Sequence, residues 1–254
     1  MIFSNDISKY TFTISLACIP IRVCCEHEEN QRFFNDYLSE GAPLFSVRPD
    51  RKDYDAMQEM IDRTEIKEGR TPSRKPDYFL ENSLIHEQIA KKLIDYNVLL
   101  MHGSTLCMDE KAYLFTAKSG TGKSTHARLW REAFGEKVRM INDDKPLLKI
   151  VNNKVTVYGT PWNGKHRLGS NASAELKAII WLTRGEMNHI EQMAKAEIYP
   201  VILSQSYRSS DPAKMIKILA LQRELTAAVE FYKLSCNMEK DAALTAYNGI
   251  NSER

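Results

Sequence analysis

Residues 117–125 read A-K-S-G-T-G-K-S-T, and this stretch decides how the rest of the chain is interpreted. The preceding residues 112–116, A-Y-L-F-T, are apolar and β-prone, and residues 126–134 have the composition of a helix. A strand, a glycine-bearing turn and a helix that opens with Lys-Ser form the context that a phosphate-binding loop requires. The sequence therefore predicts a nucleotide-phosphate site at this turn.

The residues of this loop have distinct expected roles. Gly120 and Gly122 allow successive backbone N–H groups to point into one concavity, because no Cβ blocks a phosphate there. The N–H groups that begin the following helix add its positive dipole end. Lys123 is expected against the outer phosphates, and the Ser124 hydroxyl is expected on the accompanying Mg²⁺. The expected nucleotide-binding residues are Ser119, Gly120, Thr121, Gly122, Lys123, Ser124 and Thr125.

One position of the loop departs from the usual pattern, since Ala117 stands where Gly normally begins the motif. The plain alternative is a glycine turn between a strand and a helix, with an exposed lysine. The apolar strand before the turn and the helix after it favour the nucleotide site over that alternative.

Composition excludes several classes of protein. The chain has 254 residues, 43% of them hydrophobic and 27% charged, which is typical of a soluble globular protein with one or two domains. A net charge of +2, from 35 basic and 33 acidic residues, gives no overall bias toward nucleic acid or membranes. The 5 scattered cysteines favour reduced thiols and a cytoplasmic location.

Residues 1–95 are expected to form a smaller α+β portion. Residues 11–25 are apolar enough to suggest a signal peptide, but residues 11–16 alternate polar and apolar side chains, which favours a strand over a signal peptide or a membrane span. Segment 67–77 combines basic residues with two prolines and a glycine, which favours a solvated connection over a site for an acidic partner. The expected elements are strands at 10–16 and 19–24 and helices at 53–62 and 82–96.

Residues 96–254 are expected to form the nucleotide-binding core. Residues 108–111 are polar enough to turn the chain, so the strand before the loop should belong to a hairpin. Asp211-Pro212 is a typical helix start. The expected strands are 98–101, 105–107, 112–115, 137–141, 147–151, 154–158, 178–182, 189–193 and 231–234. The expected helices after the loop helix are 196–205, 212–228 and 238–247.

Two adjacent acids follow one of these strands. Asp143 and Asp144 end a hydrophobic stretch, which is the usual place for the acid that holds magnesium in a nucleotide site. Adjacent side chains on an extended segment point in opposite directions, so one acid is expected at the metal and the other elsewhere. The alternative is an acidic turn before Lys145, which the nearby loop motif disfavours.

Three further side chains are candidates for the same site. His102 lies on the strand that leads into the loop hairpin and is expected to reach the strand end that carries Asp143. Such a contact would orient the carboxylate and tune its proton affinity. Lys165 and Arg167, in the turn-rich stretch 159–167, would supply positive charge to a transferring phosphoryl group. A solvated basic loop is an equal alternative for these two residues.

The order of these motifs resembles the catalytic core of the HPr kinase/phosphorylase family, which is related to phosphoenolpyruvate carboxykinases. The matching motifs are H-G-S (102–104), the hairpin, the loop and I-N-D-D (141–144). The resemblance implies an α/β P-loop core of mixed sheet with flanking helices. It also implies ATP and Mg²⁺, and a base that takes the proton from a serine hydroxyl. The residues carried over are His102, Lys123, Ser124 and Asp143, with Asp143 and Ser124 at the metal and Asp144 beside them.

The chain also departs from that family. Ala117 replaces the first loop glycine, residues 1–95 do not resemble the family's N-terminal domain, and G-T-P-W-N-G-K stands where a later signature is expected. The resemblance is therefore to a divergent relative, in a branch that includes serine kinases acting on small peptides. It implies an ATP-dependent kinase whose partners are a nucleotide and a serine-bearing protein or peptide, with no nucleic acid and no membrane.

Two other functions remain as alternatives. An ordinary P-loop NTPase or small-molecule kinase would place the loop after the first strand of a parallel sheet, and the expected hairpin argues against it. A nucleotide-binding regulator without turnover would not need both His102 and Asp143. The phosphate acceptor, phosphorolysis and the oligomeric state, a homo-oligomer included, are left open by the sequence.

Overall fold

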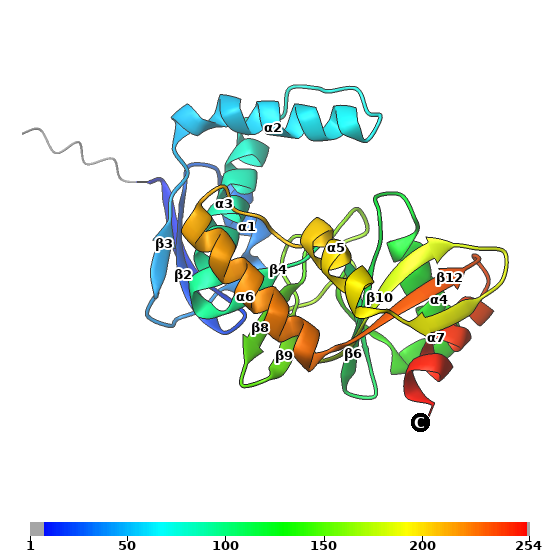
Figure 1. Ribbon diagram of the computed structural model, residues 1–254. Helices are drawn as coiled ribbons and strands as arrows, with labels where there is room; N and C mark the ends of the chain where they lie inside the picture. Colours follow the sequence, from blue (N-terminus) through cyan, green and yellow to red (C-terminus); the bar gives the residue numbers. More distant parts are fainter. Residues whose placement is uncertain (1–7, 253–254) are drawn as a thin grey trace, which may run out of the picture. The chain divides into compact units, whose positions relative to one another are not determined.

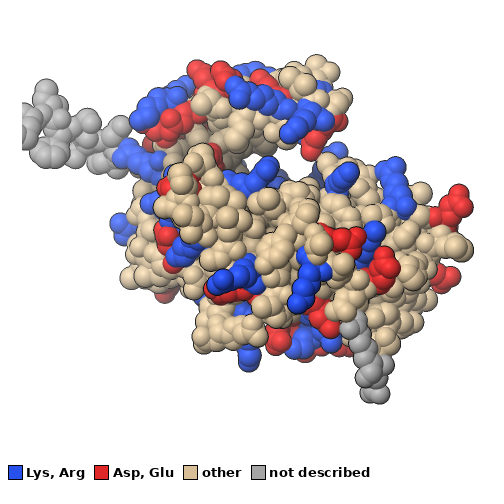
Figure 2. Space-filling view, viewed as in Figure 1, with Lys and Arg blue, Asp and Glu red and all other residues tan. Residues whose placement is uncertain are grey.

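The computed structural model describes residues 8–252, and the chain divides into two compact units, up to Lys92 and from Leu93 onward (Figure 1). Both units contain helices and strands, so the fold is mixed α/β, as the sequence predicts. Within residues 8–252, no helix combines the length and the apolar character needed to span a bilayer. On the face seen in Figure 2, Lys and Arg side chains are interspersed with Asp and Glu.

The first unit contains a three-stranded sheet. Strands β1 and β2 form an antiparallel hairpin whose turn residues, Ala17 and Cys18, have φ values of 51° and 59°. Strand β3 pairs in parallel with β2. The elements are β1 (Tyr10–Leu16), β2 (Ile19–Cys25), α1 (Glu28–Phe33), β3 (Phe45–Val47), α2 (Tyr54–Lys67) and α3 (Asp77–Leu93). The two strands expected from the alternating pattern are confirmed.

Both longer helices of the first unit extend beyond their expected bounds. Helix α2 continues to Lys67 instead of ending at residue 62, and α3 begins at Asp77 instead of residue 82. The start of α3 follows Pro76, whose carbonyl accepts hydrogen bonds from the first turn of the helix. The extra turn buries Leu80 in a small core with Tyr54 and other side chains of α2. Sequence periodicity missed this turn because its remaining residues are polar or exposed.

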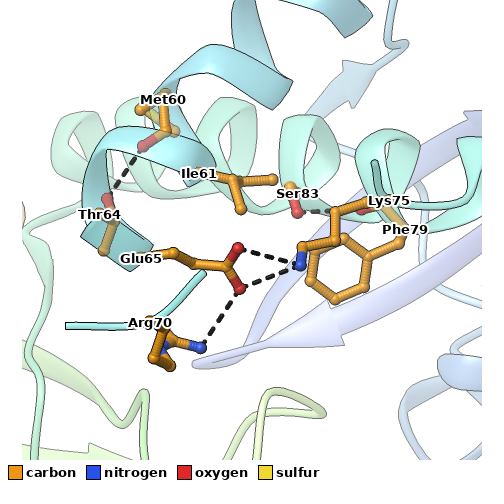
Figure 3. A pocket seen from close by; sticks show the side chains of 8 residues that line it. All are labelled: Met60, Ile61, Thr64, Glu65, Arg70, Lys75, Phe79 and Ser83. Carbon is orange, nitrogen blue, oxygen red and sulfur yellow. Dashed lines mark hydrogen bonds and ion pairs between the residues drawn. The ribbon is translucent and has the colours of Figure 1, made fainter. Parts of the chain in front are cut away.

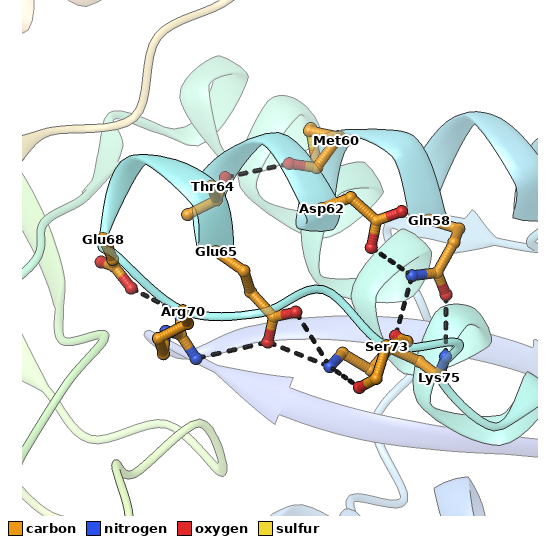
Figure 4. Close-up of polar contacts among 9 residues, drawn as sticks. All are labelled: Gln58, Met60, Asp62, Thr64, Glu65, Glu68, Arg70, Ser73 and Lys75. Carbon is orange, nitrogen blue, oxygen red and sulfur yellow. Dashed lines mark hydrogen bonds and ion pairs between the residues drawn. The ribbon is translucent and has the colours of Figure 1, made fainter.

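The segment between α2 and α3 is held in place by two buried polar side chains of α2 (Figure 4). The Gln58 amide donates to the Ser73 carbonyl at 3.1 Å and accepts from the Lys75 N–H at 2.8 Å. Glu65 binds the Lys75 ammonium through both carboxylate oxygens, at 2.9 and 3.1 Å, and Arg70 at 3.4 Å. The expected solvent-exposed connection is present. In addition, hydrogen bonds and ion pairs fasten it to α2.

The second unit is built on a nine-stranded mixed sheet in which β4-β8-β9-β10-β6-β5-β7 are successive neighbours, with β12 on β10 and β11 on β12. Its strands are β4 (Val98–Leu100), β5 (Ser104–Met108), β6 (Lys111–Thr116), β7 (Arg139–Asn142), β8 (Leu147–Val151), β9 (Lys154–Tyr158), β10 (Ser173–Arg184), β11 (His189–Gln192) and β12 (Glu230–Cys236). Its helices are α4 (Lys123–Phe134), α5 (Lys195–Gln205), α6 (Pro212–Ala228) and α7 (Asp241–Asn251). Each expected strand and helix is present; β8, β9 and α6 have the expected bounds, and the ends of the other elements are shifted.

The helices cover both faces of this sheet (Figure 1). Helices α5 and α6 pack on one face and α4 and α7 on the other, so successive residues of β6, such as Leu114 and Phe115, belong to opposite cores. The largest side chain of the second core is Trp130 of α4, which is fully buried and lies 5.4 Å from Phe115 between ring centroids. Helix α4 is thereby fixed to the sheet.

Strand register brings separate parts of the chain to one edge of the sheet. In the predicted hairpin, Ser104 of β5 lies opposite Phe115 of β6, and the pairing is antiparallel. Strand β7 also runs antiparallel to β5, and it places Asn142 opposite Thr105. The start of β5 therefore lies beside the ends of β6 and β7. The loop after β6 and the acids after β7 emerge at the same edge.

A buried histidine lies directly after the loop on α4. His126 is 2% exposed, its Nε2 accepts from the Trp130 indole N–H at 3.0 Å, and its Nδ1 has no partner among the described residues. Burial lowers the pKa of His126 from 6.5 to about 3, because the charged form cannot be solvated there. His126 is therefore neutral in the folded protein.

This burial predicts acid sensitivity. The pKa of His126 is lower in the folded chain than in the unfolded chain, so between about pH 6.5 and pH 3 the unfolded chain binds a proton that the folded chain does not bind. The contribution of His126 to the free energy of unfolding is therefore fully present above about pH 6.5 and is lost as the pH falls toward 3. Substitution of His126→Gln should flatten the dependence of the unfolding free energy on pH by up to about 1.4 kcal/mol per pH unit in this range. Denaturant titrations across the range measure it, with the exposed His189→Gln as control. Equal slopes for wild type and His126→Gln would contradict the account.

The fastened loop gives a second prediction. Substitution of Glu65→Ala leaves the half-buried Lys75 ammonium without its carboxylate and should weaken local stability by about 2 kcal/mol. Hydrogen exchange at residues 70–76 should accelerate accordingly. Glu59→Ala, on the same helix but exposed and, among the described residues, paired with Arg63 alone, is the matched control and should have little effect. Unchanged exchange in the Glu65 variant would show that the ion pair does not hold the loop.

Candidate functional site

The loop between β6 and α4 has the backbone conformation that its glycines predict. Gly120 and Gly122 have φ values of 75° and 118°, a region that side chains disfavour. Gly122 is the N-cap of α4, and its carbonyl accepts from the His126 N–H at 2.9 Å. Ala117 is completely buried and has no positive φ, so its backbone does not require glycine. This explains physically why alanine is accommodated at the first position.

Helix α4 begins at Lys123, so the first N–H groups of the helix face the loop and have no acceptor within the helix. Within the loop, the Thr121 N–H donates to the Lys118 carbonyl at 3.2 Å and closes a tight turn. Ser124 is exposed in the first turn of the helix. The arrangement of N–H groups, a lysine and a hydroxyl is suited to a phosphate and its metal.

The two acids after β7 lie in a bend and contact different partners. Asp143 is 6% exposed, and its Oδ1 accepts from the Ser104 hydroxyl at 2.6 Å. Asp144 Oδ1 lies 3.3 Å from His102 Nε2. The expected His–Asp contact is thus present, but it involves Asp144 and not Asp143. The Gly103 N–H donates to the Asp144 carbonyl at 3.1 Å, which aligns His102 with Asp144 and Ser104 with Asp143.

The turn that carries the acids is fixed by Asn142, the last residue of β7. Asn142 is completely buried, and its Oδ1 accepts from the Asp144 N–H at 2.8 Å and the Lys145 N–H at 2.6 Å. Its amide donates to Thr160 Oγ1 at 3.0 Å. An asparagine that ends a strand before a turn is the available sequence signal, because its side chain mimics a backbone turn.

Electrostatics connect the loop with the acids. Burial alone would raise the pKa of Asp144, but the hydrogen bond with His102 and the positive charges of Lys145 and Lys123 outweigh it. The pKa of Asp144 therefore lies below its usual value, and this carboxylate is ionised at neutral pH. Lys123 of the loop is the smallest of these contributions, so its charge acts on Asp144 more weakly than His102 and Lys145 do.

The basic loop passes beside Asp143 through its backbone. A Cβ at Gly164 would lie 3.2 Å from the Asp143 carbonyl oxygen and 3.6 Å from its Oδ2. Lys165 and Arg167 are exposed, and no hydrogen bond or ion pair joins them to another described residue. The structure therefore brings the loop backbone to the acid but leaves these two side chains in solvent.

The donor set can be compared with the needs of a magnesium ion. In residues 8–252, no three or more His, Cys, Asp or Glu side chains gather as a metal-binding group. Magnesium in nucleotide sites is usually held by one or two carboxylates together with phosphate oxygens. The Ser124 hydroxyl and the carboxylates of Asp143 and Asp144 offer oxygen atoms, which Mg²⁺ prefers as ligands. They fit a Mg²⁺ shared with nucleotide phosphates and do not fit a cage formed by protein alone.

Comparisons with known proteins add little to this geometry. No protein-family model matches the chain, and no curated protein matches its sequence. Among solved structures, the Hpr(Ser) kinase/phosphatase from Coxiella burnetii is similar, with 14% sequence identity and a TM-score of 0.35. The match covers 59% of this chain and 95% of that protein. A similarity this weak does not establish a shared activity or substrate.

Proposed function

We propose that this protein is an ATP- and Mg²⁺-dependent phosphotransferase that phosphorylates a hydroxyl, with a serine of a protein or peptide as acceptor. One observation supports the proposal: the antiparallel pairing of β5 with both β6 and β7 brings the glycine loop and the acid pair to one edge of the sheet. Groups suited to binding phosphates and groups suited to accepting a proton therefore emerge at the same edge. Phosphoryl transfer needs both, because catalysis there consists mainly of positioning and charge stabilisation.

The loop is proposed to bind the triphosphate. The backbone N–H groups of residues 118–124 and the first turn of α4 surround the phosphates, and Lys123 neutralises the outer ones. The side chains of Ser119, Thr121 and Thr125 lie along the same turn. When bound, Mg²⁺ would neutralise phosphate charge, with Ser124 and Asp143 as the proposed ligands.

Asp143 is the proposed base. It accepts the proton of the acceptor hydroxyl as that oxygen forms a bond to the γ-phosphorus, and ADP leaves with the electrons of the broken P–O bond. The Ser104 hydroxyl holds Oδ1, which fixes the carboxylate while Oδ2 remains on the side of Gly164. Asp144, held by His102, balances the charge of Lys123. Lys165 and Arg167 remain proposed contacts of the transferred group.

Topology favours this proposal over an ordinary P-loop NTPase. Strand β6 pairs in parallel with β10 on one side and antiparallel with β5 on the other. The loop therefore follows the second strand of a hairpin, whereas the alternative requires it after the first strand of a parallel sheet. The antiparallel neighbour also supplies Ser104, which holds the proposed base.

The loop lysine gives the first functional prediction. Lys123→Ala should weaken MgATP binding by about 10- to 100-fold, the loss expected for a charge-assisted contact with phosphate. Calorimetric titration with MgATP measures the change. Lys137→Ala, an exposed lysine just beyond the same helix, is the matched control and should bind as wild type does. Equal affinity of wild type and the Lys123 variant would remove the loop from the nucleotide site.

The proposed base, Asp143, gives the second functional prediction. Asp143→Asn should reduce phosphotransfer to a serine-bearing acceptor, or the slower transfer to water, by about 100-fold or more. MgATP binding should persist within about tenfold of wild type, since one metal ligand is altered but the phosphate contacts remain. Transfer from radiolabelled ATP measures turnover, with the exposed Asp36→Asn as control. Nucleotide binding without any turnover that depends on Asp143 would favour a regulator over an enzyme.

A further inference from the structure

The last residue of β10 reaches the phosphate loop. Trp181 of β10 pairs with Thr116, the last residue of β6, so β10 continues past the point where β6 gives way to the loop. Arg184, at the end of this extension, donates from Nη2 to the Gly120 carbonyl at 2.7 Å. The extension thus positions a guanidinium against the loop.

The charge of this arginine is not balanced by an acid. Among the described residues, no carboxylate pairs with Arg184, and the Gly120 carbonyl is its only hydrogen-bond partner. Several other exposed arginines pair with carboxylates, namely Arg32, Arg51, Arg63, Arg74 and Arg128, whereas Arg167, like Arg184, pairs with none among the described residues. A guanidinium keeps its charge at all physiological pH values, and its fork of N–H donors suits phosphate.

The hydrogen bond also constrains the loop itself. The carbonyl of Gly120 and the N–H of Thr121 belong to one planar trans peptide and point in opposite directions. When Arg184 holds the carbonyl, the Thr121 N–H is turned toward the Lys118 carbonyl, to which it donates at 3.2 Å. Arg184 therefore sets the orientation of a peptide at the crest of the loop.

We propose that Arg184 is a phosphate-positioning residue with two roles: it holds the loop through Gly120, and its other N–H donors bind the outer phosphates of the nucleotide. The first role concerns the loop alone. The second rests on the proposed function, because it requires the loop to bind ATP. Arg184, at the end of β10, would thus stabilise the outer phosphates together with Lys165 and Arg167 of the loop after β9.

Nucleotide binding tests the phosphate contact. Arg184→Ala should weaken MgATP binding about tenfold and MgADP binding clearly less, since the outermost phosphate is missing from ADP. Arg184→Lys, which keeps the charge but loses the fork of N–H donors, should bind MgATP with an affinity between those of Arg184→Ala and wild type. Arg139→Ala, at the opposite end of the sheet, is the control. Equal losses for MgATP and MgADP, or no loss, would overturn the phosphate contact.

Hydrogen exchange tests the positioning role without nucleotide. In the nucleotide-free protein, Arg184→Ala should accelerate exchange at residues 118–124, while residues 104–108 of β5 should exchange as in wild type. Unchanged exchange in the loop would overturn the positioning role. If wild type bound no MgATP, the proposed function and the phosphate contact would both fail, and loop exchange would still decide the positioning role. If Lys123→Ala abolished binding but Arg184→Ala did not, only the inference about Arg184 would fail.

Discussion

The pairing of β5 with both β6 and β7 is the constraint on which the candidate site depends. Because both pairings are antiparallel, the start of β5 meets the end of each neighbour at one edge of the sheet. That edge carries the glycine loop after β6 and the acids after β7. Ser104, the first residue of β5, then holds Asp143 through a buried hydrogen bond. A one-residue slip of register would turn these side chains to the opposite face.

The two units differ in how their charges are balanced. In the first unit, the basic side chains near Glu65 pair with acids and line a small cavity of about 210 Å³ with Phe79 and other residues (Figure 3). Their charges are balanced within the unit, which leaves little attraction for a charged ligand. In the second unit, Arg184 beside the loop has no acidic partner among the described residues. Unbalanced positive charge next to backbone N–H groups is the arrangement that attracts phosphate.

Local patterns in the sequence were enough to predict most elements, because alternation, turn residues and helix caps are local. The Asp211 cap is an example, and it occurs in the structure. The site was predictable only where one motif carries the chemistry, as in the loop. The partner of His102 was assigned to the wrong neighbour, because register between strands decides it. Arg184 gave no sequence signal, since its position depends on how far β10 extends beyond β6.

The account rests on the claim that the loop and the acid pair face one bound triphosphate. The most direct measurement is a crystal structure of the protein with Mg²⁺ and a nonhydrolysable ATP analogue. The account predicts phosphates surrounded by the N–H groups of residues 118–124, with the γ-phosphate between Lys123 and the carboxylate of Asp143. An analogue bound elsewhere, or a loop filled by phosphates with both acids turned away from them, would contradict it.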